Sequence, residues 1–396
     1  MARSSPESSS PTGLPAARIG MATVAAASAV LVGIGLARFA FDPLQPALVS
    51  AGWFHSGGSA RLASANLTGY LLGALIAAPL SRRIAARNLI RAAMLAIAVS
   101  FLVCAAEESP FGWFLGWRVV SGVAGGVIMT LAGPAVLAYA PKPRRDFIGQ
   151  MIAYGMTGGI LIAGAAMPLV LGTSVSLAWL MLGVISLLAT VLTWRMWPPP
   201  LPVPPKAARK PEHAWLFCLQ YSLVALGLVP HTIALVNYIA SDLKLGVTVA
   251  SRYFLVYGLG SLAGPLIYSF GAPRIGLRPM LKLGIAVQFI AVGLLLVSSS
   301  PAVLVTSSFL GGLGIPALIA LFLLRSQVMT DGDPWRHRAL WGAATVATAI
   351  TQTIAAFGTS ALIEQFGVGG LAYPVVFATA SAALLIAFML EFAIRR

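Results

Sequence analysis

Residues 114–126 read Phe-Leu-Gly-Trp-Arg-Val-Val-Ser-Gly-Val-Ala-Gly-Gly and place one arginine, Arg118, inside an apolar stretch that continues to about Tyr139. A charged side chain at the centre of a bilayer costs about 3 kcal/mol or more, so a chain that keeps one must give it polar partners. Gly122, Gly125 and Gly126 follow the arginine, and small residues let a neighbouring helix approach closely. The stretch therefore predicts a packed membrane helix in which the arginine has a purpose.

The composition places the whole chain in a membrane. Hydrophobic residues make up 58%, charged residues 9%, and the mean hydropathy is +0.88, whereas soluble domains carry about 25% charged residues. A helix of roughly 20 apolar residues crosses the hydrocarbon core. Such runs occur at residues 20–41, 59–80, 88–106, 111–139, 146–171, 175–195, 214–240, 249–270, 279–298, 301–326, 339–363 and 371–393. The sequence predicts an all-α membrane protein with twelve transmembrane helices in two six-helix bundles.

The polar segments divide the chain into four parts. A disordered N-terminal tail is expected over residues 1–18, followed by the N-terminal bundle over 19–195. Residues 196–213 combine seven prolines with Lys206, Arg209 and Lys210, and this composition favours an extended linker. The C-terminal bundle spans residues 214–396.

The net charge of +15 follows the expected membrane topology. Of the 26 Lys and Arg residues, 21 fall on the side of the two termini and the linker. By the positive-inside rule that side is the cytoplasmic one, so both termini and the linker are expected in the cytoplasm. The same distribution argues against nucleic acid as a partner, because the charge follows the loops of one membrane side and forms no separate patch.

No motif for catalysis or for a cofactor is present. Cys104 and Cys218 lie in apolar spans, without the spacing of a zinc site or a disulfide framework. The spans lack paired aspartates, Ser with Lys, and His-Glu-x-x-His, and the chain lacks the Gly-x-x-x-x-Gly-Lys-Ser loop that binds ATP. We expect neither an enzyme nor a resident cofactor or metal.

Six plus six helices with a basic linker resemble the major facilitator superfamily of secondary transporters. Arg118-x-x-Ser-Gly122 is similar to the motif of its fourth helix. The basic loops that this resemblance marks as conformational motifs recur in both halves, as Arg82, Arg83 and Arg87 and as Arg274, Gly276 and Arg278. The first loop lacks the acid and the glycine of the family pattern. The recurrence supports an internal repeat.

The first span resembles the YbfB/YjiJ-type transporters in particular, through Gly35-Leu-Ala-Arg38-Phe-Ala-Phe41 and the Asp-Pro-Leu-Gln-Pro that follows. Leu226–Thr232, Trp341-Gly342 and Gln352 add to the resemblance. It implies the fold, transport and a multi-pass protein of the bacterial inner membrane, and it gives no substrate.

Ionisable side chains in the outer half of the expected spans are the candidates for function. At 1.5 Å per residue, Arg38, Arg118 and His231 lie about 27, 10 and 25 Å from the starts of the first, fourth and seventh spans. Asp42 follows Arg38 by one turn, so the two can pair. Glu391 is placed at the cytoplasmic end of the last span. The hypothesis is a positive site of Arg38 and Arg118, with His231 or Asp42 taking a proton, which favours an anionic substrate.

Structural interpretations of the same residues stand beside this hypothesis. Arg38 can reach the outer surface or pair with Asp42, and Arg118 can bind carbonyls of a broken helix. His231 can satisfy the carbonyl that Pro230 leaves unpaired. The polar side chains at cavity depth can bind substrate or only join helices; the site candidates among them are Asn66, Tyr154, Tyr221 and Gln352.

Together these features predict a monomeric secondary active transporter in the lipid bilayer. It would move a small organic solute by alternating access, with the proton as coupling ion. The alternatives are a multidrug-type exporter of hydrophobic compounds and a non-transporting membrane sensor with the same fold.

Overall fold

The computed structural model of the protein describes residues 14–107, 109–200, 214–366 and 370–393, and within them every regular element is a helix. The N-terminal half contains α1 (Ala16–Val30), η1 (Leu31–Leu36), η2 (Phe39–Phe41), α2 (Leu44–Ser50), α3 (Ser56–Leu80), α4 (Ala86–Val103), α5 (Phe111–Leu137), η3 (Lys142–Arg144), α6 (Arg145–Leu161), η4 (Ile162–Ala166), α7 (Met167–Leu171) and α8 (Val175–Thr193).

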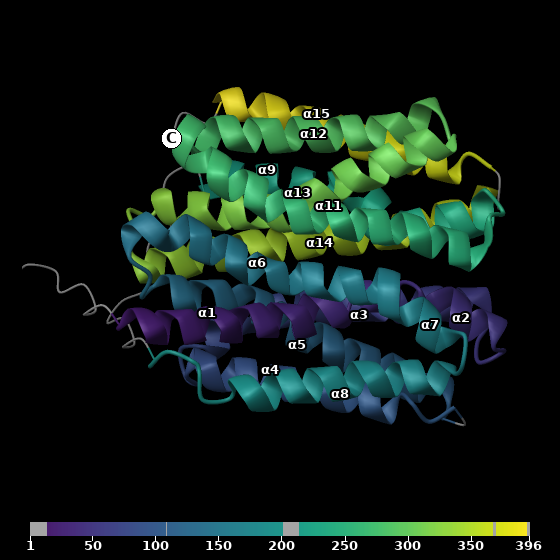
Figure 1. Ribbon diagram of the computed structural model, residues 1–396, viewed down its shortest axis with the longest axis horizontal. Helices are drawn as coiled ribbons and strands as arrows, with labels where there is room; N and C mark the ends of the chain where they lie inside the picture. The colour runs from purple at the N-terminus through teal and green to yellow at the C-terminus, as the bar shows by residue number, and fades with distance from the viewer. Residues whose placement is uncertain (1–13, 108, 201–213, 367–369, 394–396) are drawn as a thin grey trace, which may run out of the picture.

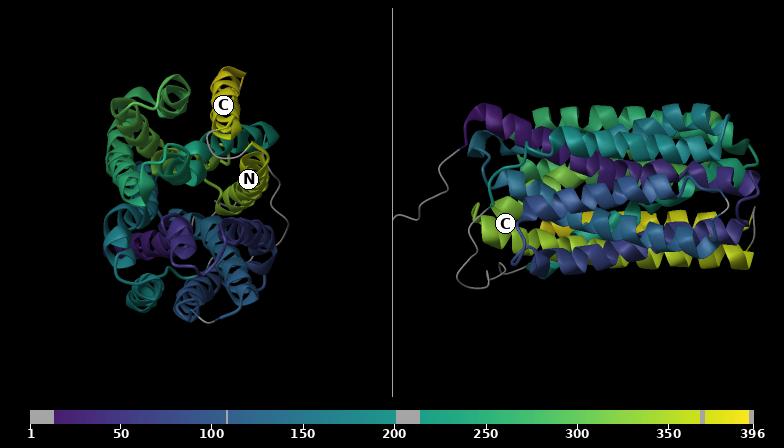
Figure 2. Two further views of the ribbon diagram at one scale, coloured as in Figure 1. Left: turned by 90° about the vertical axis from the view of Figure 1, so that its right-hand side faces the viewer. Right: turned by 90° about the horizontal axis from the view of Figure 1, so that it is seen from below.

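The C-terminal half repeats this plan with longer uninterrupted helices. It contains α9 (Ala214–Gly227), η5 (Pro230–Ala234), α10 (Leu235–Asn237), η6 (Tyr238–Asp242), α11 (Gly246–Ile275), α12 (Leu277–Val297), α13 (Pro301–Val328), α14 (Pro334–Phe366) and α15 (Ala372–Ala393). In Figures 1 and 2 the purple-to-teal and the green-to-yellow helices form two adjacent groups. The start of α1 and the end of α15 lie together at one end of the molecule, called here the terminal end (Figure 1).

The predicted fold class is confirmed, with differences at the boundaries. Eleven helices in the described residues are long and apolar enough to cross a membrane. The expected seventh span, residues 214–240, is not one helix. It is divided into α9, η5, α10 and η6. The first of these interruptions lies at Pro230, which lacks an N–H and cannot continue the hydrogen bonding of an α-helix. Helix α1 begins at Ala16, inside the segment expected to be a tail; residues 1–13 and 201–213 of the expected tail and linker lie outside the described residues.

Both halves therefore start with an interrupted helix. After α1, the chain winds into the π-helical turn η1, bends at Ala37 and Arg38, and continues as the short 3₁₀ helix η2. The corresponding helix of the second half passes from α9 into the π-helical turn η5. Discontinuous helices at corresponding places of two repeats are the usual location of a transporter's binding site.

Glycines bring the helices of each half into close contact. Helices α3 and α5 pack with Gly69, Gly73, Gly122 and Gly126 between their backbones, and a Cβ at any of them would overlap backbone of the other helix. Helices α11 and α13 pack in the same way through three further glycines, Gly260, Gly264 and Gly312. The recurrence of this packing in the two halves agrees with an internal repeat.

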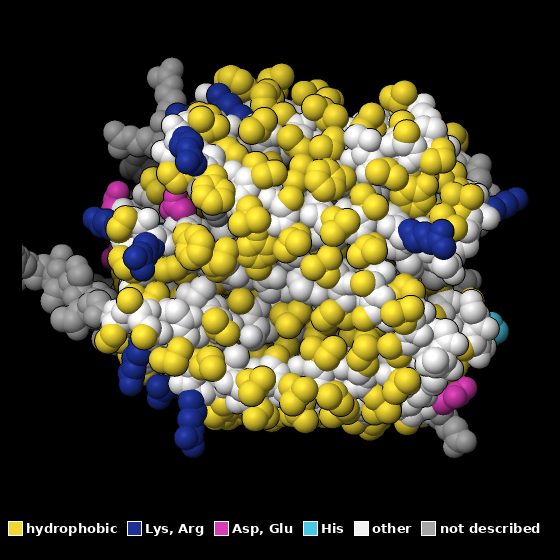
Figure 3. Space-filling view, viewed as in Figure 1, with side chains coloured by type: hydrophobic (Ala, Val, Ile, Leu, Met, Phe, Trp, Pro, Cys, Tyr) yellow, Lys and Arg dark blue, Asp and Glu magenta, His cyan; other side chains and the backbone are white. Residues whose placement is uncertain are grey.

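The surface carries an apolar belt. Figure 3 shows hydrophobic side chains across the middle of the visible face, whereas Lys and Arg gather mainly at the terminal end. A belt of this kind between polar ends is what a bilayer requires, and the helices satisfy their backbone hydrogen bonds internally. The molecule is thus built to span a membrane along its long axis.

Candidate functional site

Arg118 lies at the interruption of the first helix. Its guanidinium Nη1 donates to the carbonyl of Ala37 at 3.0 Å, where η1 ends. The guanidinium carbon is 3.8 Å from the centre of the Phe41 ring, and the side chain is 1% exposed. A cation over an aromatic face and a bond to a free carbonyl are favourable partners for a charge inside a membrane. This geometry is the one expected for an arginine that binds a broken helix.

Asn66 supports the same arrangement from α3. Its Nδ2 donates to the carbonyl of Arg118 at 3.2 Å and to Ser121 Oγ at 2.8 Å. The amide is buried between α3 and α5. Asn66 therefore joins two helices of one half, and it positions Arg118 through the backbone.

Arg38 reaches across to the other half of the molecule. Its Nη1 donates to Gln352 Oε1 of α14 at 2.8 Å, and its Nη2 is buried without a hydrogen-bond partner. The expected pair with Asp42 is not formed: salt bridges among the described residues join Arg278 and Arg325 to Glu391 and Arg336 to Asp331. The interpretation in which Arg38 reaches the outer surface is also wrong, because the side chain is half-buried and directed to Gln352.

A narrow polar pocket lies between the two interrupted helices. The gaps between its lining side chains add up to about 210 Å³, including the part open to solvent, but they leave no room for a water molecule. Sites for small molecules usually measure about 300–1,000 Å³, so the pocket cannot hold a solute in this conformation. Its lining joins residues of the first helix with residues of η5, α10 and α11, and it consists of Asp42, Gln45, His231, Thr232, Leu235, Val236, Asn237 and Phe254.

His231 is fully buried at the edge of this pocket. Its Nε2 lies 2.9 Å from Ser307 Oγ, and Ser307 in turn donates to the carbonyl of Ala291 at 2.7 Å. Because the hydroxyl gives its only proton to Ala291, it must accept from His231, which assigns the hydrogen of a neutral imidazole to Nε2. Nδ1 then carries the lone pair, and it has no hydrogen-bond partner.

The local sequence makes room for this ring. A Cβ at Gly311 of α13 would lie 2.5 to 2.8 Å from the nearest ring atoms of His231. The ring of Tyr257 stacks on the imidazole with centroids 6.2 Å apart and an angle of 8° between the planes. The idea that His231 satisfies the carbonyl left by Pro230 is wrong, since the imidazole bonds to the side chain of Ser307.

Of the eight candidates from the sequence, the pocket lining contains Asp42 and His231. Tyr154 and Tyr221 lie outside it and contact other helices. The hydroxyl of Tyr154 donates to the carbonyl of Leu262 at 2.9 Å and so joins α6 to α11. The ring of Tyr221 stacks on Phe322 and Trp341, with centroids 4.7 and 5.5 Å away. Both join or pack helices in this conformation, which is the second of the two roles that the sequence left open for such side chains.

Comparison with known proteins agrees with the fold. A family model described as uncharacterised MFS-type transporter YbfB matches residues 30–392. The chain belongs to this family. It is a multi-pass membrane protein of a transporter family, and the family is not one of enzymes. None of the curated proteins matches it.

The solved structures that match include a bacterial homologue of the iron transporter ferroportin in an outward-facing state. That structure is 15% identical, the alignment covers 94% of this chain and 98% of the other, and the TM-score is 0.67. At this identity the similarity shows the major facilitator fold alone.

In this YbfB-type transporter the two halves also meet at the terminal end. Trp341 Nε1 of α14 donates to the carbonyl of Met129 in α5 at 3.1 Å, and Gln327 Nε2 of α13 is 3.4 Å from the carbonyl of Leu137. Trp341 is buried. These contacts close the space between the halves on the side of the two termini.

The two basic loops differ in their contacts. Arg82 and Arg83 are exposed, and Arg87 is half-buried on the first turn of α4. In the second loop, Gly276 has a φ of +93°, which suits glycine, and separates α11 from α12. Arg274 Nη1 bonds to the carbonyl of Phe270 at 2.5 Å, whereas Arg278 Nε lies 3.6 Å from Glu391 Oε1.

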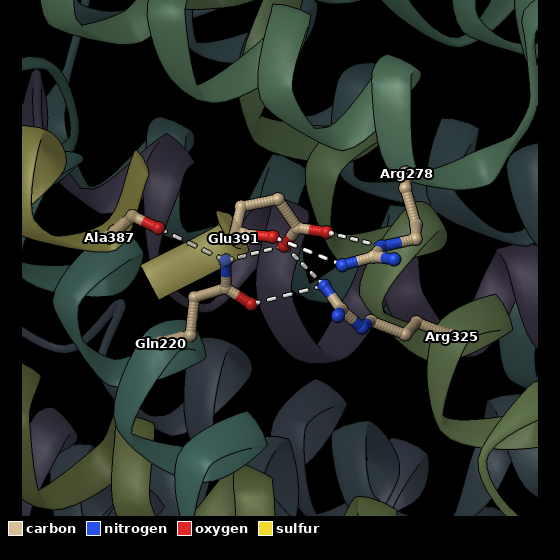
Figure 4. A network of polar contacts seen from close by, with 5 residues as sticks. All are labelled: Gln220, Arg278, Arg325, Ala387 and Glu391. Carbon is tan, nitrogen blue, oxygen red and sulfur yellow. Dashed lines mark hydrogen bonds and ion pairs between the residues drawn. The ribbon is translucent and has the colours of Figure 1, made fainter. Parts of the chain in front are cut away.

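Glu391 is a buried acid that the sequence analysis left aside. Figure 4 shows its carboxylate between Arg325, Arg278 and Gln220, which come from α13, α12 and α9. Arg325 forms a short ion pair with one carboxylate oxygen, and Gln220 Nε2 donates to the same oxygen at 2.7 Å. The network joins four helices of the C-terminal half at the terminal end. Two features of the sequence could have indicated this network: a carboxylate inside the last apolar run and an arginine inside α13.

Replacing Glu391 with Gln leaves Arg325 buried without its anion. Breaking a buried pair in this way costs about 3–5 kcal/mol, so we expect a clear fall in the unfolding temperature of the purified protein in detergent. Asp331→Asn is the matched control, because Asp331 pairs with Arg336 at the surface at 3.5 Å, where such pairs contribute about 0–1 kcal/mol. Equal unfolding temperatures for the two variants would contradict the structural role of Glu391.

Proposed function

We propose that the protein is a proton-coupled secondary active transporter of a small anionic organic solute. The observation that carries the proposal is the contact of Arg38 with Gln352, which crosses between the halves at the interruption of the first helix. Asp42 of the same interruption lines one pocket together with His231. A cation without a salt bridge and two proton-binding groups thus occur where the repeats meet.

The charges around the pocket favour an anion. Arg38 and Arg118 supply two positive charges against the single carboxylate of Asp42, and Arg118 is engaged with Ala37 and Phe41. Arg38 donates to a neutral amide and lies 5.6 Å from the centre of the Phe39 ring, and its Nη2 has no hydrogen-bond partner. A guanidinium binds a carboxylate through two parallel hydrogen bonds. The substrate's carboxylate would therefore take the place of Gln352 on Arg38.

The proton has two acceptors in the pocket. The imidazole of His231 keeps a free lone pair at Nδ1, and Asp42 lines the same pocket without a salt bridge to the arginines. Histidine is the side chain that changes charge near neutral pH. An imidazolium at this place would attract the carboxylate of Asp42 and so couple protonation to the distance between the first and seventh spans.

Transport would follow alternating access. The halves are in contact at the terminal end through Trp341 and Gln327, and the pocket is smaller than an ordinary ligand site. A solute can enter only after the halves move apart, which is the rocking motion of inverted-repeat transporters. The interruptions beside the pocket supply places where the first and seventh spans can bend.

The basic terminal end supports the expected orientation. With 21 of the 26 Lys and Arg residues on that side, we infer cytoplasmic termini, in a bacterial inner membrane. A single chain contains both halves and both sides of the pocket, so we infer that the monomer is the transporting unit.

Purified protein in proteoliposomes tests the anion site. With an inward pH gradient, wild type should accumulate a radiolabelled carboxylate from a panel that also contains neutral amino acids and cationic dyes. Arg38→Gln should lower uptake at least about tenfold, and Arg38→Lys should restore part of it, since Lys keeps the charge and loses the two-pronged geometry. Arg252→Gln, an exposed arginine on α11, is the control. Transport of dyes alone would favour the exporter, and full activity of Arg38→Gln would remove Arg38 from the site.

Replacing His231 with Gln separates coupling from binding. The variant keeps a hydrogen-bond donor for Ser307 and loses the proton-binding nitrogen, so exchange of labelled for unlabelled solute should continue while accumulation driven by the pH gradient stops. Asp42→Asn is compared in the same assay. Gradient-driven accumulation by His231→Gln at the wild-type level would show that the proton binds elsewhere.

A further inference from the structure

Helices α4 and α8 pack side by side at the outer edge of the N-terminal half (Figure 1). The surface along the line where they meet is called here the α4–α8 groove, and basic residues gather at one end of it. Arg87 and Arg91 are one turn apart on α4, and the guanidinium carbon of Arg91 is 5.2 Å from the centre of the Trp194 ring at the end of α8. Arg195 follows as an exposed residue. This end of both helices is the terminal end, where Figure 3 shows basic side chains over the lower left of the molecule.

The two arginines of the groove lack an anionic partner. The Nε atoms of Arg87 and Arg91 are buried without a hydrogen bond, and Arg91 Nη1 contacts only the Asn88 amide oxygen at 3.4 Å. None of the salt bridges among the described residues includes either of them. Like charges four residues apart on a helix repel each other. An anion between them would relieve this repulsion.

The groove continues as an apolar strip toward the middle of the membrane. Leu95 follows Arg91 by one turn on α4 and is 41% exposed. On α8, Val191 and Leu187 precede Trp194 at helical spacing and are 63% and 37% exposed. Tryptophan favours the depth of lipid head groups, where its ring is apolar and its N–H is polar. The arginines, the tryptophan and the apolar strip thus follow one another in the same order as the head group, the interface and the acyl chains of a phospholipid.

We propose that the α4–α8 groove binds an anionic phospholipid, with the phosphate between Arg87 and Arg91 and an acyl chain along Leu95 and Val191. Basic pockets between transmembrane helices on the cytoplasmic side bind such head groups. A free phosphate would leave the apolar strip unused. The neighbouring Arg82 and Arg83 are exposed on the turn after α3. They carry the same charge outside the α4–α8 groove and therefore serve as the control.

Native mass spectrometry of the purified protein tests the site independently of transport. Wild type in detergent is titrated with phosphatidylglycerol and with phosphatidylcholine, and bound lipid is counted. Arg87→Gln with Arg91→Gln should weaken phosphatidylglycerol binding about 30-fold, since each basic side chain near an anionic lipid surface contributes about fivefold. Arg82→Gln with Arg83→Gln removes the same charge from the exposed turn just before α4 and should bind as wild type does.

Several results would overturn the proposal. One is that the two glutamine double variants lose phosphatidylglycerol binding to the same extent. Another is that wild type binds phosphatidylcholine as tightly as phosphatidylglycerol. A third is that millimolar inorganic phosphate displaces the bound phosphatidylglycerol. Arg87→Lys with Arg91→Lys guards against a misfolded variant, because it keeps the charge and should retain phosphatidylglycerol. Loss of binding in this lysine variant at an unchanged unfolding temperature would contradict a head-group site based on charge.

Discussion

The carbonyl of Ala37 must find a donor inside the membrane, and Arg118 supplies it. Where η1 ends, the first helix no longer pairs its own backbone groups, and an unsatisfied carbonyl in hydrocarbon costs several kcal/mol. The same bond gives the buried arginine a polar partner, so two expensive groups satisfy each other. Because the interruption is held there, the following residues turn Arg38 toward α14 and place Asp42 in the pocket.

The second half meets the same constraint with different side chains. Pro230 interrupts the seventh span, and His231 is held beside the interruption by Ser307, whose hydroxyl bonds to Ala291. Each interrupted helix therefore brings an ionisable group to the surface between the halves. The glycine contacts of α3 with α5 and of α11 with α13 keep each half compact. In the proposed cycle, a proton or an anion that changes the charge in the pocket would act on two preformed bodies.

The sequence was enough for the fold and for the residues at the interruptions. Hydropathy located the spans because a helix in lipid must satisfy its backbone internally, and the cost of a buried charge singled out Arg118, Arg38 and His231. The hydrogen-bond partners of these residues could not be predicted from the sequence, since Gln352 is 314 residues from Arg38 and no local pattern links the two. The burial of Glu391 could not be predicted for the same reason: it depends on Arg325 and Gln220 from other helices. The π-helical turn after Val30 has no proline to announce it.

Arg118 holds the interrupted first helix, and in the proposed mechanism Arg38 exchanges Gln352 for the substrate. The most direct measurement is the thermal unfolding midpoint of purified Arg118→Gln and Arg38→Gln in the same detergent. We expect a marked fall for Arg118→Gln, because the carbonyl of Ala37 loses its donor, and a midpoint close to wild type for Arg38→Gln. The reverse order, with Arg118→Gln as stable as wild type and Arg38→Gln destabilised, would contradict these roles.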